Sequence, residues 1–318
     1  MTANFFTSTP FAVGGYMLCS ACLLISNKVA IHFLAAPSFI LFAQLMGTVA
    51  VVQGANALGY ISVENFDTNK AIKFLPVALI FLLTIYMNMK SLQYANVETF
   101  MIFRFSTPLC ITFAEYVYLG RELPSLRGWI SLIALFVGAI GYALTDSAFQ
   151  MEGYLFCALW YIIFCLDQIY LKHITNTVKM ENWSRVFYSN LLASMPLVVP
   201  FLLSSSEMAA VQSMSLNGFL ALMVSVFLGA AMSYFAWMAR SLLAATSFTI
   251  VGNVCKILTI AINVMIWDKH ASLFGIFCLL FCLGAAYYYE QAPLRDTKPP
   301  ESDIEAAGVD PLLGKSNQ

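Results

Sequence analysis

The chain has 318 residues, of which 60% are hydrophobic and only 10% are charged. Soluble domains usually contain about 45–50% apolar and about 25% charged residues, so this composition excludes an ordinary soluble domain, a disordered chain, a coiled coil and a disulfide-stapled secreted module. The 16 Lys and Arg residues nearly balance the 17 Asp and Glu residues. This balance provides no basic field for nucleic acid, and a polytopic protein in the lipid bilayer is the remaining class.

Ten segments are apolar enough to cross a bilayer core as helices, which takes about 20 residues each. In chain order they cover 11–33, 36–58, 72–91, 96–119, 126–145, 151–171, 182–203, 217–239, 246–267 and 271–289. Transmembrane β-strands would be shorter and would alternate in polarity. We therefore expect an all-α polytopic membrane protein with ten transmembrane helices. The flanking segments are a short cytosolic N-terminus, 1–10, and a polar, disordered cytosolic tail, 290–318.

The Lys and Arg residues of the loops, the segment ends and the tail are distributed unevenly between the two sides of the membrane. With the N-terminus inside, the cytosolic side holds Lys70, Lys73, Arg121, Arg127, Lys172, Lys179, Arg185, Arg240, Arg295, Lys298 and Lys315. The opposite side holds Lys90 and Lys269. Because cytosolic loops carry the excess of basic residues, this pattern predicts that both termini face the cytosol.

The two halves of the chain, 11–145 and 146–289, resemble each other weakly. Residues 90–95, for example, parallel residues 240–245 at an offset of 150. A repeat of five helices places the second copy upside down relative to the first. Inverted repeats are typical of secondary transporters, in which the substrate site lies near the midplane between the copies.

Small residues in the predicted spans are interpreted as packing positions. Gly138, Gly141 and Gly284 are expected to allow close approach of helices, and they would also permit a homodimer. Cys19 and Cys22 have the spacing of a redox or metal pair, but no second pair accompanies them. We therefore expect the cysteines to act as small apolar residues, and we expect no metal or cofactor.

Lys256 lies near the middle of the ninth span and shares one helical face with Thr249, Gly252 and Asn253. A cation at the bilayer centre costs roughly 2.5–3.5 kcal/mol on insertion scales, so such residues usually face a cavity or pair with a carboxylate. The pattern predicts a receptor for phosphate. The alternative is a polar seam that holds neighbouring helices together.

Two further cations lie inside predicted spans. Arg104 is either a second phosphate contact or the partner of a structural carboxylate. Lys28, which follows Asn27 in the first span, either lines the site or extends toward the lumenal edge. The intramembrane acids Glu115 and Asp167 lie toward the cytosolic ends, and Glu115 is expected to be structural or part of a gate.

The seventh span presents an aromatic ring, a hydroxyl and an amide in one turn, from Tyr188, Ser189 and Asn190. A ring of this kind can stack on a nucleobase and an amide can hydrogen-bond to its edge. This turn predicts nucleobase recognition. Ser233 and Tyr234 in the eighth span are further candidates for the site.

These features together resemble the nucleotide-sugar and triose-phosphate translocator family of the drug/metabolite transporter superfamily. The resemblance covers most of 11–289 and is closest to Golgi GDP-sugar transporters. In that group the seventh span carries Phe-Tyr-Asn-Asn, which Phe187, Tyr188 and Asn190 match while Ser189 replaces the first Asn. The ninth span carries Gly-Ala-Leu-Asn-Lys, in which Gly252 and Lys256 match and the three residues between them differ.

The resemblance implies that Ser189 and Asn190 contact the base and that Lys256 contacts the diphosphate. It implies a secondary antiporter that imports cytosolic nucleotide sugar, preferably a GDP-sugar, into the Golgi lumen in exchange for nucleoside monophosphate. The alternatives are a carrier of UDP-sugars or of another phosphorylated metabolite, and a membrane structural or receptor-like protein that transports nothing. The sequence has no nucleophile–base constellation and no Walker-type loop, so neither an enzyme nor an ATP-driven pump is expected.

Overall fold

The computed structural model describes residues 8–94, 97–143, 151–266 and 273–295, and almost all of them are helical. In chain order the α-helices are α1 (Thr9–Phe33), α2 (Pro37–Ala57), α3 (Thr68–Tyr94), α4 (Val97–Tyr118), α5 (Leu126–Ala143), α6 (Met151–Thr177), α7 (Asn182–Ser194), α8 (Val198–Leu203), α9 (Ser205–Gln212), α10 (Leu216–Leu242), α11 (Ala245–Ile266) and α12 (Leu273–Tyr288). Within the described ranges there is no β-strand, and one isolated bridge joins Arg121 and Leu294. The expected all-α membrane architecture is confirmed.

Local sequence signals begin several of these helices. Ser8 caps α1, where its side chain accepts a hydrogen bond from the backbone N–H of Phe11 at 3.4 Å. Ser215 caps α10 in the same way, with the N–H of Gly218 at 3.1 Å. Proline at the first turn, as at Pro37 of α2, has no N–H to leave unsatisfied there.

Each of the ten expected segments falls on helical structure. By length and composition, six helices in the described part of the chain can cross a membrane, with bounds Thr9–Phe33, Pro37–Ala57, Thr68–Asn88, Gly153–Thr177, Asn182–Leu203 and Leu216–Leu242. The count of ten crossing helices therefore stays a prediction. The expected terminal segments 1–10 and 290–318 lie mostly outside the described residues.

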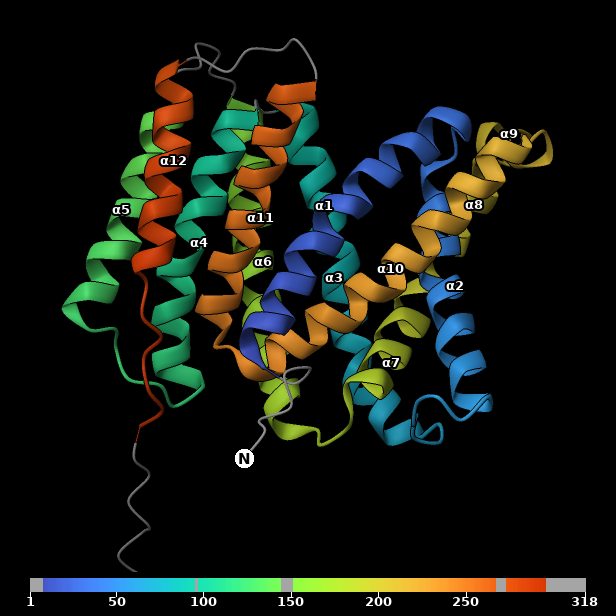
Figure 1. Ribbon diagram of the computed structural model, residues 1–318, viewed down its shortest axis with the longest axis horizontal. Helices are drawn as coiled ribbons and strands as arrows, with labels where there is room; N and C mark the ends of the chain where they lie inside the picture. Colours follow the sequence, from blue (N-terminus) through green and yellow to red (C-terminus); the bar gives the residue numbers. More distant parts are fainter. Residues whose placement is uncertain (1–7, 95–96, 144–150, 267–272, 296–318) are drawn as a thin grey trace, which may run out of the picture.

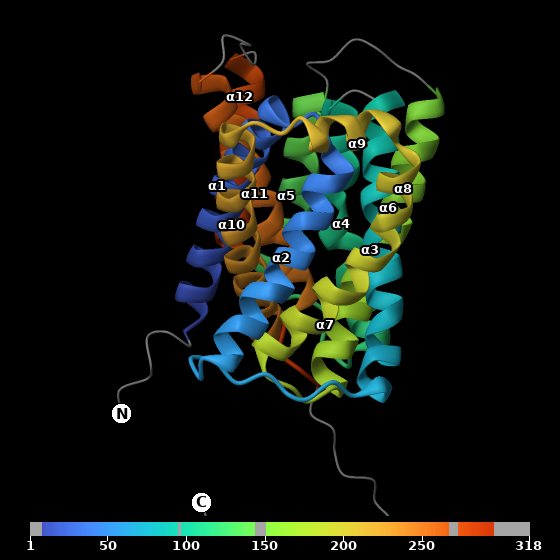
Figure 2. The same ribbon diagram turned by 90° about the vertical axis from the view of Figure 1, so that its right-hand side faces the viewer.

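The seventh segment differs from the expectation of one regular helix. The α-helix α7 ends at Ser194, a 3-10 turn covers Met195–Leu197, and α8 continues from Val198. Pro196 lies in that turn, and a proline there removes a backbone donor and clashes with the carbonyl four residues earlier. Figure 2 shows α7, α8 and α9 following one another, and all three contact α2. The short helix α9 was not predicted.

The helices pack in pairs that join the two halves of the chain. The helix α1 lies along α10, α3 lies along α6, and α5 lies along α12 (Figure 1). The beginning of α1 and the end of α12 lie on the same face of the molecule. The packing therefore brings helices from the first half of the chain into direct contact with helices from the second half.

The glycine predictions have different outcomes. A Cβ atom at Gly138 would lie 2.5 Å from Cys282 Sγ, and one at Gly141 would lie 2.9 Å from Cys278 Sγ. These two glycines therefore permit the close contact of α5 with α12, as predicted. The prediction for Gly284 is wrong, because this residue is exposed and a Cβ there would have no neighbour within 4 Å among the residues that the structure describes.

Several of the basic residues that we expected in cytosolic loops lie inside helices, and three of them lie at contacts between α6, α7 and α10. Lys172, Arg185 and Arg240 belong to α6, α7 and α10, and the first two are buried. These side chains bond to backbone carbonyls or to a side chain of a neighbouring helix. Arg185 Nη2, for instance, donates to the carbonyl of Thr175 at 3.1 Å.

Candidate functional site

A cavity of about 330 Å³ lies between helices of both halves, and it is the candidate functional site. A volume of this size is at the lower end of the range for small-molecule sites. Its walls are mostly apolar, with polar groups from α1, α2, α7 and α10. These groups belong to Tyr16, Gln44, Thr48, Ser189, Asn190, Ser233, Trp237 and Arg240.

Ser189 and Asn190 reach the cavity from α7, as the sequence predicts for site residues. Both side chains bond to their own helix. Ser189 Oγ donates to the carbonyl of Arg185 at 2.7 Å, and Asn190 Nδ2 donates to the carbonyl of Val186 at 2.7 Å. Asn190 Oδ1 accepts a bond from Ser233 Oγ on α10 at 3.4 Å, so the two helices present linked polar groups to the cavity.

The two tyrosines among the predicted site residues lie outside the cavity lining. Tyr188 is completely buried, and its hydroxyl oxygen accepts a hydrogen bond from the N–H of Asp67 at 2.7 Å. Its ring stacks on Phe66 with centroids 5.6 Å apart. Tyr234 stacks on Trp183 at 4.1 Å. In this conformation both rings stack on protein neighbours, and neither residue lines the cavity.

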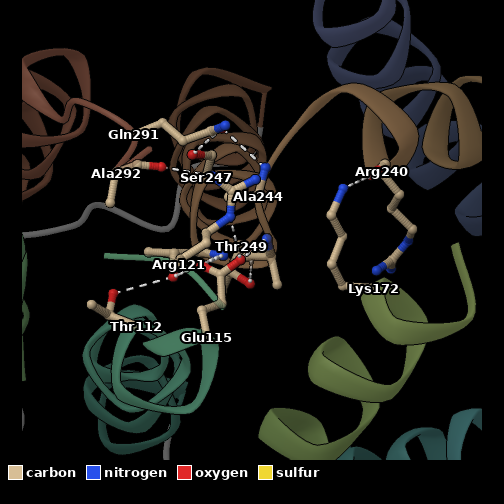
Figure 3. A network of polar contacts seen from close by, with 12 residues as sticks. Thr112, Glu115, Arg121, Lys172, Arg240, Ala244, Ser247, Thr249, Gln291 and Ala292 are labelled. Carbon is tan, nitrogen blue, oxygen red and sulfur yellow. Dashed lines mark hydrogen bonds and ion pairs between the residues drawn. The ribbon is translucent and has the colours of Figure 1, made fainter. Parts of the chain in front are cut away.

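Arg240 is the cation that borders the cavity. Its Nη1 donates to Gln168 Oε1 at 2.8 Å, and its guanidinium lies 3.9 Å from the centroid of the Phe248 ring. Its backbone carbonyl accepts a bond from Lys172 Nζ at 2.9 Å, and Figure 3 shows these two side chains together. One guanidinium edge is thus fixed by α6 while the residue borders open volume, as an anion site requires.

The polar face of α11 packs toward α4 and α1, beside the cavity rather than on its wall. Asn253 is buried and its Nδ2 donates to the carbonyl of Arg104 at 3.4 Å. A Cβ at Gly252 would lie 3.9 Å from the hydroxyl of Tyr16, which borders the cavity. Lys256 is partly buried in this region, and in the described part of the chain no carboxylate lies within 4.0 Å of its ammonium.

The remaining predicted site residues occupy separate positions. The guanidinium of Arg104 lies over the rings of Phe164 and Trp160, at 5.6 and 5.8 Å. Its Nε is buried and has no hydrogen-bond partner within the described ranges. Asn27 accepts a bond of 2.6 Å from Nε2 of Gln44, a cavity residue. Lys28 lies in α1, and its side chain lies outside the described residues.

Glu115 joins α4 to the beginning of α11 and lies outside the cavity (Figure 3). Its carboxylate accepts bonds from the N–H groups of Ala245 and Thr246 and from the Thr246 hydroxyl, at 2.7, 3.2 and 2.6 Å. Arg121 Nε lies 3.5 Å from the same carboxylate. A carboxylate that caps a helix N-terminus has a structural role, which supports that reading of the sequence.

Comparison with known proteins places this arrangement in a family. The family model described as the Triose-phosphate Transporter family matches residues 10–290. The chain belongs to the Triose-phosphate Transporter family. It is therefore a transporter and not an enzyme. A solved crystal structure shares the fold with a TM-score of 0.65, at 14% identity, over 88% of this chain and 96% of its own.

Proteins named as GDP-fucose or GDP-mannose transporters are similar in sequence to nearly the whole of this chain. GDP-fucose transporter 1 of Arabidopsis thaliana is 35% identical over 96% of this chain and 93% of its own length. GDP-mannose transporter GONST3 of the same plant is 32% identical, with 92% and 82% covered. The GDP-mannose transporter of Kluyveromyces lactis is 24% identical, with 94% and 95% covered.

Five polar cavity residues of this family member were not selected from its sequence: Tyr16, Gln44, Thr48, Trp237 and Arg240. For two of them, the sequence contains a pattern that could have indicated a site residue. Gln44 is an amide in the middle of an apolar segment, and such residues usually mark a functional or packing contact. Trp237 follows Ser233 by four residues and Arg240 follows Trp237 by three, which places the three on one face of α10.

Proposed function

We propose that this transporter is a secondary antiporter for nucleotide sugars, with GDP-sugars preferred. It carries cytosolic nucleotide sugar into the Golgi lumen and returns the nucleoside monophosphate left after glycosyl transfer. The observation that carries this proposal is the cavity between the two halves, which has an arginine at one position and amide, hydroxyl and indole groups at others. The two GDP-sugar transporters that are more than 30% identical support the choice of ligand.

The helix packing supports two inverted halves. In an inverted repeat, α1 corresponds to α6, α2 to the α7–α8 pair, α3 to α10, α4 to α11 and α5 to α12. Exchanging the two halves then turns the α1–α10 contact into the α6–α3 contact. It also turns the α2–α10 contact into the α7–α3 contact. All four contacts are present, as a twofold repeat requires. Rocking of such halves about a central site gives alternating access.

Both termini are proposed to face the cytosol. The beginning of α1 and the end of α12 lie on the same face, which fits an even number of crossings such as ten (Figure 1). The excess of basic residues among the loops and helix ends on that side supports the orientation.

The proposed site has a base end and an anion end. Asn190 and Ser233 contact the base edge, and Gln44 and Asn27 provide a second amide pair. Arg240 receives phosphate in the conformation described here. Lys256, with Gly252, Asn253 and Arg104 beside it, joins the anion end when the halves move, since it lies near Arg104 and has no carboxylate partner in the described chain.

A counterflow experiment tests this proposal. Purified protein is placed in liposomes preloaded with GMP, UMP or inorganic phosphate, and labelled GDP-mannose, GDP-fucose or UDP-galactose is offered outside. We expect GMP to accelerate uptake of the GDP-sugars most strongly. Acceleration by UMP alone would reject the guanine preference, and acceleration by none of the three would reject exchange itself.

The matched family favours one second candidate, a carrier of another phosphorylated metabolite, because its description names triose phosphate. The same assay separates the two. A triose-phosphate carrier would exchange inorganic phosphate against triose phosphate and would leave GDP-sugars outside.

A further inference from the structure

We propose that Trp237 is the stacking surface for the nucleobase, and that Ser189 is a positioning residue that holds the indole in place. The proposal rests on the nucleotide transport proposed above and deepens it. It also changes the reading of the seventh helix, where the sequence suggested that Tyr188 stacks and that Ser189 contacts the base.

The hydroxyl of Ser189 already uses its one hydrogen and one of its lone pairs. It donates to the carbonyl of Arg185 at 2.7 Å and accepts a bond from the indole Nε1 of Trp237 at 3.0 Å. A serine hydroxyl has one hydrogen to donate. In this conformation the group therefore supplies the partner that a buried indole N–H requires, and it has no hydrogen left for a ligand.

A second contact of the indole is with an aromatic ring of α3. The rings of Phe74 and Trp237 lie 5.8 Å apart at 47°, and Phe74 in turn packs against Tyr188 at 5.8 Å. Tyr188 is anchored through its hydroxyl to the backbone of Asp67. Tyr188 of α7 therefore packs on Phe74, and Phe74 packs on Trp237. Of these three aromatic residues, Trp237 is the one that borders the cavity.

The position of Trp237 along α10 suits a nucleotide. Arg240 follows it by three residues on the same cavity, which is about 4.5 Å of helix rise. Ser233 precedes it by one turn and is bonded to Asn190. A base stacked on the indole would have the amide and hydroxyl at its edge, and its phosphate would extend toward the guanidinium.

Stacking depends on ring area, so this surface discriminates between bases. A purine covers more of an indole than a pyrimidine does, and loss of one stacking side chain lowers affinity for a base by about 5- to 150-fold. We therefore expect the pair Ser189 and Trp237 to set a preference for guanine over uracil nucleotides.

The test is inhibition of GDP-mannose counterflow by external GMP and by external UMP, in Trp237→Leu, Trp237→Phe, Ser189→Ala and Ser189→Thr. We expect Trp237→Leu to raise the half-inhibitory concentration of GMP by about 5- to 150-fold and that of UMP much less. Trp237→Phe and Ser189→Ala should raise the ratio of the half-inhibitory concentration of GMP to that of UMP by a smaller factor. Ser189→Thr keeps the hydroxyl and should keep the ratio of the unmodified protein. In Trp237→Leu, the further change Ser189→Ala adds nothing.

Trp129→Leu is the matched control, since Trp129 lies on α5 against Phe113 and outside the cavity lining. A GMP to UMP ratio that stays constant in all Trp237 and Ser189 variants, or that moves equally in Trp129→Leu, would overturn the proposal. If Trp237→Leu does not fold, Trp237→Phe and Ser189→Ala decide the outcome.

A binding measurement separates this proposal from the transport function. GMP should quench the fluorescence of the unmodified protein and of Trp129→Phe, and it should quench Trp237→Phe much less. Equal quenching in Trp237→Phe rejects the stacking surface even if exchange is normal. If the unmodified protein neither binds nor exchanges any nucleotide, the proposed function fails and this inference fails with it.

Discussion

The carboxylate of Glu115, near the end of α4, accepts a hydrogen bond of 2.7 Å from the backbone N–H of Ala245, the first residue of α11. Glu115 belongs to the first half of the chain and Ala245 to the second. Gln291 completes this cap, since its Oε1 accepts from Ala244 N–H at 3.0 Å and from Ser247 Oγ at 2.9 Å (Figure 3). The beginning of α11 is thus held by side chains that are distant in sequence.

Replacement of Glu115 should destabilise the protein. Glu115→Ala leaves two buried N–H groups and the Thr246 hydroxyl without their acceptor, and hydrogen bonds to charged groups contribute about 1.5–3 kcal/mol each. We expect a lower apparent melting temperature in detergent, with Glu115→Gln less affected. Glu122→Ala, in an exposed position four residues beyond the end of α4, is the control. Equal melting of the Glu115 and Glu122 variants would contradict the capping role.

Arg240 should be required for uptake rather than for folding. Arg240→Gln keeps a planar polar group that can bond to Gln168 but removes the positive charge. Truncating one partner of a buried charge pair costs about 2–5 kcal/mol, so uptake of GDP-sugar per folded molecule should fall about 30-fold or more. Arg127→Gln is the control, because that arginine is exposed and pairs with Glu290 at 3.8 Å. Uptake that is equal in both variants would exclude Arg240 from the anion end.

Lys256 distinguishes a transport site from a seam that only holds helices together. Lys256→Ala should leave the amount of folded protein unchanged and should lower uptake about 30-fold or more, as expected for a lost phosphate contact. Lys256→Arg keeps the charge and should retain part of the activity. The structural alternative predicts the reverse, with little folded protein but normal uptake per molecule.

The glycines of α5 and α12 form a matched pair for packing. Gly138→Ala brings a methyl group against Cys282 Sγ, and overpacking of this kind costs about 1–3 kcal/mol. Gly284→Ala meets open space in the described chain and should be neutral or slightly stabilising, since alanine favours the helix. Thermal unfolding of both variants measures the difference. Equal loss of stability would contradict the tight contact between α5 and α12.

The positions of the helices could be predicted from hydropathy because a membrane helix must carry about 20 apolar residues in sequence. The exact ends could not, since α6 and α10 continue past the apolar segments to include Lys172 and Arg240, whose side chains bond within the protein. Pro196 was visible in the sequence, but whether it bends or interrupts the helix depends on tertiary contacts. Such contacts decide which neighbours replace the lost hydrogen bond.

The candidate site was only partly predictable for a related reason. Asn190, Ser189 and Ser233 were found because each is polar within an apolar segment, and all three border the cavity. Residue type could not reveal that the hydroxyl of Ser189 is occupied by Trp237, or that Tyr188 points toward the backbone of Asp67. Those facts depend on which helix lies opposite, and this is a property of the folded chain.

The central claim is exchange of a nucleotide sugar for a nucleoside monophosphate through one site. It is tested most directly by measuring both fluxes at once, in proteoliposomes loaded with labelled GMP and given differently labelled GDP-fucose or GDP-mannose outside. We predict one GMP released for each GDP-sugar taken up, with both fluxes falling together in Arg240→Gln. GDP-sugar entry without GMP release, or GMP release that does not depend on external GDP-sugar, would contradict the account.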